Sequence, residues 1–188
     1  MSSNSWNQTL ITQQVDGTAL SNTTTATSIL APAAKFVLPS NLLLIGTKLR
    51  VKAHGRISTV VTSPGNLTLD VRFGSVVVFN GGASALNVAA QTNATWDLEI
   101  DLTCRSIGAS TSATMLGIGR WMTRASLNAP AVGTTTGVGT VLLPDTAPAA
   151  GTGFDSTASQ TVDLFATWGT ANASNSIRCD SYELILCN

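Results

Sequence analysis

Residues 96–105 read WDLEIDLTCR, and this stretch decides the fold class. Apolar and polar side chains alternate along it with a period of two. The apolar set is Trp96, Leu98, Ile100, Leu102 and Cys104, and the polar set is Asp97, Glu99, Asp101, Thr103 and Arg105. Because successive side chains of a β-strand point to opposite faces of the sheet, the stretch predicts a strand with one buried and one exposed face.

Three more stretches, near residues 49–57, 67–73 and 162–168, repeat this alternation and predict antiparallel sheets with one face toward a core. Residues 115–122 (MLGIGRWM) predict a weaker strand, broken at Gly117 and Gly119. No stretch of ten residues has the period of a helix. The residues expected to point inward are Leu49, Val51, Leu67, Leu69, Val71, Leu98, Ile100, Leu102, Val162 and Leu164.

Eight or more short strands in 188 residues predict an all-β fold, a two-sheet antiparallel sandwich. We expect a jelly roll rather than an immunoglobulin sandwich, because the chain is nearly twice as long as that fold and lacks its Cys…Trp…Cys framework. Residues 1–34 are rich in Asn, Ser and Thr, and we expect them to form an extended N-terminal arm. Residues 35–188 are then the jelly-roll domain.

Only 11% of the residues are charged, and the formal net charge is zero. Without a basic field, nucleic acid is not an expected partner. No apolar run approaches the roughly eighteen residues that span a membrane, so no membrane partner is expected either. The first residues lack the basic and apolar regions of a signal peptide, which predicts folding in a reducing cytoplasm. Cys104, Cys179 and Cys187 have no CxxC spacing and are expected to be free thiols.

The sequence predicts no enzyme, metal or cofactor site. His54 is the single histidine, and it lies on the polar face of its strand, where a catalytic device is not expected. The strongest enzyme-like feature is the row Asp97, Glu99 and Asp101. Carboxylates two residues apart on a strand lie about 6.5–7 Å apart at Cα, which overlaps glycosidase spacing, and their oxygens also suit Ca²⁺.

A salt ladder is the third interpretation of the acidic row, and it is the one that we favour. Its partners would be the basic row Lys48, Arg50, Lys52 and Arg56. Opposite charges that face each other across strands or subunits stabilise pairing modestly and fix its register. We therefore expect both rows to lie on outward faces and to take part in partner binding.

The predicted arm contains scattered apolar residues, namely Trp6, Leu10, Ile11 and Val15. Such a segment buries too little apolar surface of its own to offset the entropy of ordering. We expect it to become ordered only against a partner, by adding a strand to an exposed sheet edge, with Trp6 as the anchor.

Several phrases of the sequence resemble jelly-roll structural proteins of tailed bacteriophages. They are IGTKLRVKAHGRIST, NLTLDVRFG, VVVFNGGA, TNATWDLEIDLTCRSIG, TGFDSTASQTVDLFATWGTANASNSI and the closing YELIL, and they span about residues 43–187. The resemblance implies a trimeric virion component. Within that class we favour a capsid decoration (cement) protein that binds the major capsid protein on the surface of the virion. A head or tail fibre part that binds host receptors is the first alternative, and a carbohydrate-active enzyme using Asp97, Glu99 or Asp101 is the distant one.

Overall fold

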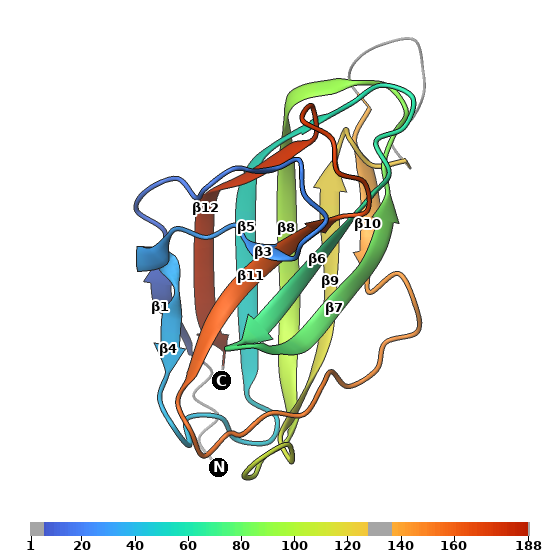
Figure 1. Cartoon of the computed structure of the whole chain (residues 1–188). Coiled ribbons are helices and arrows are strands. Elements are labelled where there is room, and N and C mark those ends of the chain that lie inside the picture. The colour runs from blue at the N-terminus through green and yellow to red at the C-terminus, as the bar shows by residue number, and fades with distance from the viewer. Residues whose placement is uncertain (1–5, 128–136, 188) are drawn as a thin grey trace.

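The computed structural model describes residues 6–127 and 137–187, which form two antiparallel β-sheets packed face to face (Figure 1). The larger sheet, sheet A, has the order β1-β12-β5-β8-β9-β10, with β2 also paired to β12. The smaller one, sheet B, has the order β3-β11-β6-β7, with β4 also paired to β11. The sequence prediction of an all-β fold with two antiparallel sheets is confirmed.

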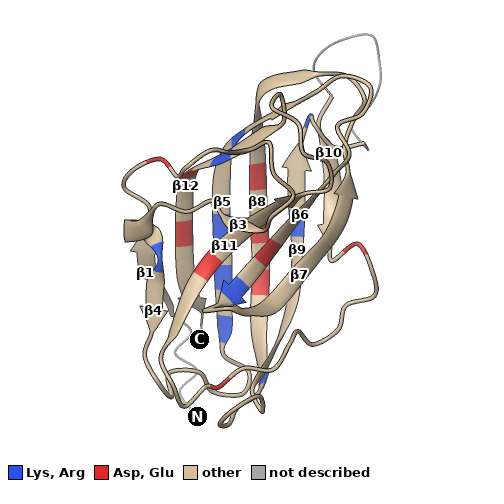
Figure 2. Ribbon diagram, viewed as in Figure 1, with Lys and Arg blue, Asp and Glu red and all other residues tan. Residues whose placement is uncertain are grey.

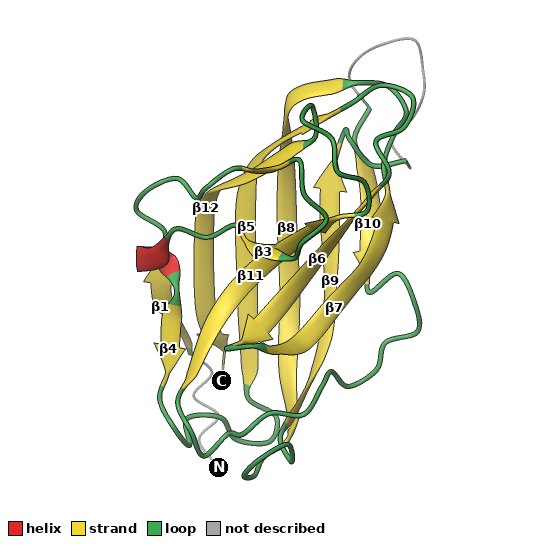
Figure 3. Ribbon diagram, in the orientation of Figure 1, coloured by secondary structure: helices red, strands yellow, loops and turns green. Residues whose placement is uncertain are grey.

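The strands of sheet A are β1 (Asn7–Thr12), β2 (Leu20–Ser21), β5 (Lys48–Thr59), β8 (Gln91–Ser106), β9 (Thr114–Thr123), β10 (Gly139–Leu143) and β12 (Ser176–Cys187). The strands of sheet B are β3 (Thr27–Ser28), β4 (Phe36–Leu38), β6 (Asn66–Phe73), β7 (Val76–Ala85) and β11 (Gln160–Trp168). In the described residues, one 3-10 turn, η1 (Pro32–Ala34), is the only helical element, as Figure 3 shows. The described residues contain no helix long and apolar enough to cross a membrane.

The core lies between the two sheets and is built by the alternation seen in the sequence. All ten residues expected to point inward are at most 3% exposed. Trp96, Trp121 and Trp168 join them as fully buried rings. The indole nitrogen of Trp96 donates a hydrogen bond to the Arg178 carbonyl at 3.2 Å, so this ring also ties β8 to β12.

The predicted break at Gly117 and Gly119 is wrong, because β9 runs unbroken through both glycines. A Cβ atom at Gly117 would overlap the ring of Phe79 from the facing sheet. One at Gly119 would lie 2.5 Å from the Glu99 carbonyl oxygen of the neighbouring strand. The glycines therefore make room for close packing inside a continuous strand.

The structure differs from the expected arm in residues 6–34, while residues 1–5 lie outside the described residues. β1 and β2 pair with β12, and β3 pairs with β11, all within the same chain. Leu20 and Ile29 belong to the same buried cluster as the rest of the core. The expectation that this segment orders only against a partner is therefore wrong for these residues.

Candidate functional site

The strands of sheet A carry most of the protein's charged residues, in rows that cross the strands (Figure 2), and these residues alternate with the buried ones and so lie on the outer face. We call this arrangement on β5, β8, β9 and β12 the charge ladder. In the β5–β8 register, Arg50 lies opposite Asp101, and Lys52 lies opposite Glu99. On the other side of β8, Glu99 lies opposite Arg120. The prediction that the two rows meet opposite charges on neighbouring strands is confirmed for these residues.

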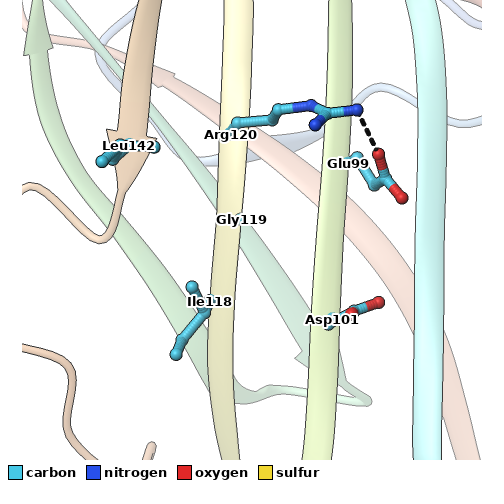
Figure 4. A pocket seen from close by; sticks show the side chains of 6 residues that line it. All are labelled: Glu99, Asp101, Ile118, Gly119, Arg120 and Leu142. Atoms are coloured by element: carbon cyan, nitrogen blue, oxygen red, sulfur yellow. Dashed lines mark hydrogen bonds and ion pairs between the residues drawn. The ribbon is translucent and has the colours of Figure 1, made fainter.

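Short ion pairs join the centre of the charge ladder. Arg50 Nε donates to Asp101 Oδ1 at 2.7 Å and lies 3.4 Å from Glu99 Oε1. Arg120 Nη2 lies 2.6 Å from Glu99 Oε2, as Figure 4 shows, and Lys48 Nζ lies 3.4 Å from Asp101 Oδ2. The hydrogen bond from Arg50 lowers the pKa of Asp101 and raises that of Arg50 itself. Arg50, Glu99, Asp101 and Arg120 are thus paired within one chain, whereas Lys52 lies opposite Glu99 without forming an ion pair with it.

The ends of the charge ladder are paired in the same way. His54 Nδ1 lies 2.8 Å from Asp97 Oδ2 across the β5–β8 pair. Arg56 Nε lies 3.0 Å from Asp180 Oδ2 of β12. Arg178 of β12 contacts both Asp180 and, at 3.0 Å, Asp16 of the N-terminal segment. Glu99 and Asp101 therefore form ion pairs with arginine, and Asp97 contacts the His54 imidazole.

This geometry bears on the other two interpretations of the acidic row, a glycosidase site and a Ca²⁺ site. A glycosidase acid needs a carboxyl group whose pKa is raised, whereas Arg50 lowers the pKa of Asp101. Among the described residues, no three His, Cys, Asp or Glu side chains are grouped so that they could hold a metal ion. The arrangement supports the interpretation as a salt ladder, in which the carboxylates hold strand register.

A shallow hollow of about 260 Å³ opens beside the charge ladder, where β8, β9 and β10 lie side by side (Figure 4). Glu99, Asp101 and Arg120 form its polar side. Its apolar side is formed by Ile118 and Leu142, which are 53% and 74% exposed. The outer face of sheet A thus changes from charged to apolar as it approaches its β10 edge.

A second ionic cluster, on the outer face of sheet B, was not anticipated from the sequence. Asp163 is buried and is held by Lys35 Nζ at 2.7 Å and by the Ser28 hydroxyl at 2.7 Å. Asp70 is 5% exposed, pairs with Arg72 at 2.9 Å, and has its pKa raised by burial. Lys35, Asp70 and Asp163 lie far apart in the sequence, and the pairing of β4 and β6 with β11 brings them together.

The four predicted partner residues of the N-terminal segment separate into two pairs. Leu10 and Ile11 are half-buried and pack against the chain's own core. Trp6 and Val15 remain 44% and 60% exposed. Because Trp96, Trp121 and Trp168 are fully buried, Trp6 is the one tryptophan with a substantially exposed ring.

Exposed aliphatic side chains also gather at one end of the sandwich, and the sequence interpretation missed them. Leu44 and Ile45 are 63% and 68% exposed on the loop before β5, and Ile107 is 43% exposed just after β8. Backbone hydrogen bonds from Gly46 to Cys104 and from Cys104 to Thr47, both 2.9 Å, hold the two segments together. We call Leu44, Ile45 and Ile107 the end patch.

No protein-family model matches the chain. No curated protein matches it either.

Proposed function

We propose that this protein is a virion structural protein, a capsid decoration protein that binds the outside of an assembled phage head and stabilises it. Its partners are the major capsid protein and further copies of itself, in a homotrimer. The resemblance of residues 43–187 to jelly-roll proteins of tailed bacteriophages is the first support. The second support is the pairing of the strands, and the third is the distribution of the exposed apolar side chains.

The strand pairing supports the jelly-roll part of the proposal. β6 pairs with β7, β5 with β8, β4 with β11 and β1 with β12, so the pairs are nested like one long hairpin. Rolling such a hairpin into two sheets gives the Greek-key arrangement of a jelly roll. The β9–β10 hairpin is then an addition at the edge of sheet A.

The end patch is the observation that carries the proposed attachment. Two consecutive aliphatic residues that are about two-thirds exposed cost solubility in a free protein, and such patches mark interaction sites. Leu43, at 5% exposed, anchors their loop in the core, so the patch is presented on a fixed base. We infer that the end patch contacts the shell. A ligand that binds only the assembled shell stabilises it by mass action.

The test is co-sedimentation with phage heads that lack this protein. The double variant Leu44→Asp/Ile45→Asp should lower the bound fraction at least tenfold. Val61→Asp/Val88→Asp is the matched control, because these residues are 59% and 57% exposed and their loops join at the opposite end of the sandwich, through the Thr62–Val88 backbone hydrogen bond. It should bind like the wild type. Equal binding by both variants would refute attachment through the end patch.

The copy number on purified particles tests the class of virion protein. Decoration requires hundreds of copies per particle, in a fixed ratio to the major capsid protein. A few or a dozen copies would instead identify a fibre or tail part, and absence from particles would refute the proposal.

A further inference from the structure

The four outer edges of the two sheets are protected to very different degrees. In sheet B, β3 and β4 have only two and three residues, and the segment after β10 covers β7 through hydrogen bonds from Asp145 to Gly81 and from Thr152 to Val77. In sheet A, the described residues give β1 no partner beyond β12 and β10 no partner beyond β9. Unpaired edges present free backbone donors and acceptors to another chain.

The charges of sheet A are placed in a way that leaves these two edges open. β5 and β8 carry four charged residues each, β12 carries three and β9 one, whereas β1 and β10 carry none. Natural proteins usually guard edges with charged side chains, especially lysine. Here the inner strands are charged and the edges are neutral, so two such edges can approach each other without repulsion or loss of charge hydration.

The directions and lengths of the two edges are complementary. Each of the five steps from β1 to β10 is antiparallel, so β1 and β10 run in opposite directions on opposite sides of the sheet (Figure 1). Copies related by rotation can therefore bring β1 beside β10 as an antiparallel pair. The cross-strand row that contains Leu142 reaches β1 at Thr12, so overlap of the two strands along their lengths requires the strands to be tilted to the rotation axis. The six residues of β1 match the five of β10.

From these observations we propose that β1 of one copy pairs with β10 of the next copy and extends sheet A across a head-to-tail interface. This inference rests on the proposed homotrimer, because head-to-tail contacts close into rings when the rotation permits. The occupant of each edge is a second copy of this chain, since the sheet itself carries both complementary edges.

The faces of the strands fix the register. Thr9 donates a hydrogen bond to Glu183 and so lies on the outer face of β1, as does Asn7, two residues before it. On β10, Leu142 is exposed and its neighbour Leu143 is buried, so the outer face holds Thr140 and Leu142. Full overlap with matched faces then places Asn7 opposite Leu142, and Thr9 opposite Thr140. The bulge between Thr9 and Ile11 ends the regular pairing.

Trp6 gains a role in this arrangement. It immediately precedes β1 and therefore lies at the end of β10 where Leu143 is followed by Pro144. A large exposed ring at the margin of a new strand pair can pack on the neighbouring copy. Because the other three tryptophans are buried, quenching of tryptophan fluorescence by acrylamide reports mainly on Trp6.

Cysteine cross-linking tests the register. The background is Cys187→Ser, because Cys187 lies opposite Asn7 within the same chain. A short bifunctional thiol reagent should join Asn7→Cys of one chain to Leu142→Cys of another when the two single variants are mixed, and give covalent trimers with the double variant. Within one chain these positions are more than about 24 Å apart, because five strand spacings of about 4.8 Å separate β1 from β10, so the product is intermolecular.

Each outcome decides the matter. Covalent dimers from Leu142→Cys alone would show a symmetric β10 contact and overturn the proposal. A wild type that is monomeric by light scattering, or an intact oligomer without cross-links, would also overturn it. In addition, Thr140→Lys should raise the dissociation constant of the oligomer at least tenfold and keep Trp6 accessible to acrylamide, at unchanged melting temperature. Val61→Lys, at an exposed end loop, is the matched control and should change neither quantity.

The outcomes also separate this inference from the proposed function. Shell binding without β1–β10 cross-links would leave the decoration role standing and refute the interface. Cross-linked trimers that fail to bind shells would leave the interface standing and refute the role.

Discussion

Ile100 and Ile118 allow the sandwich to be tested with one substitution at two positions. Ile100 on β8 is fully buried, while Ile118 on the neighbouring strand β9 is 53% exposed on the outer face. Truncation to alanine removes three carbon groups, and about 0.8 kcal/mol for each buried group gives about 2.4 kcal/mol at Ile100. The cavity left in a close-packed core adds to this, so Ile100→Ala should lose about 2–5 kcal/mol of unfolding free energy.

Ile118→Ala removes the same atoms from a half-exposed site and leaves no enclosed cavity, so it should lose about 1 kcal/mol or less. Urea unfolding followed by circular dichroism measures both losses, provided that the m value stays constant between variants. A loss at Ile100 no larger than the loss at Ile118 would refute the inward face assigned to β8, and with it the pairing of the whole ladder.

Three further predictions follow from the packing and the ion pairs. Gly55→Ala should lower the unfolding free energy by about 1–3 kcal/mol in the same urea assay, because a methyl group there would overlap the Arg178 carbonyl oxygen and touch the Trp96 ring. The control His54→Ala, on the exposed face of the same strand, should lower it by less than about 1 kcal/mol. Arg50 lowers the pKa of Asp101, so this carboxylate stabilises the fold above the ordinary carboxyl pKa of about 3.8, and the gain is lost as pH falls through its folded-state pKa. The unfolding free energy of the wild type should therefore exceed that of Asp101→Asn by about 0.5–1 kcal/mol at pH 6, and this difference should shrink below pH 4. A difference that does not change with pH would contradict the ion pair. Burial raises the pKa of Cys179 to about 12 and also that of Cys104, so a thiol reagent should label the half-buried Cys187 first, and Cys187→Ser should abolish fast labelling of the folded protein.

The alternation in the sequence was enough to predict the four strands β5, β6, β8 and β11 and their buried faces, because burial of one face leaves a strand only one orientation. It was not enough to predict which strands pair. Arg50 and Asp101 are 51 residues apart, and their contact depends on the nested order of the strands. The cluster of Lys35, Asp70 and Asp163 on sheet B could not be predicted for the same reason, because its members come from three separate stretches of the sequence.

The N-terminal segment shows why local composition misled the interpretation. Its apolar residues are sparse because each short piece, such as β2 or β3, contributes one or two side chains to a core that other strands complete. Leu20 accepts a hydrogen bond from the Trp168 indole through its backbone carbonyl, and Gly17 donates one to Cys179. Neither contact has a signature in the sequence, since backbone groups of any residue can make it.

The placement of charge connects the fold to the proposed assembly. The sequence left it open whether the basic and acidic rows meet within one chain or between subunits, and the ion pairs of Arg50, Glu99 and Asp101 place them within one chain. Exposed pairs of this kind add little stability, so their main effect is to hold the register of β5 and β8. A face on which most charges are already paired offers little electrostatic attraction to a partner. In the assembly that we propose, the contacts between copies fall to the neutral edges β1 and β10 and the contact with the shell falls to the end patch, where binding depends on backbone hydrogen bonds and apolar burial.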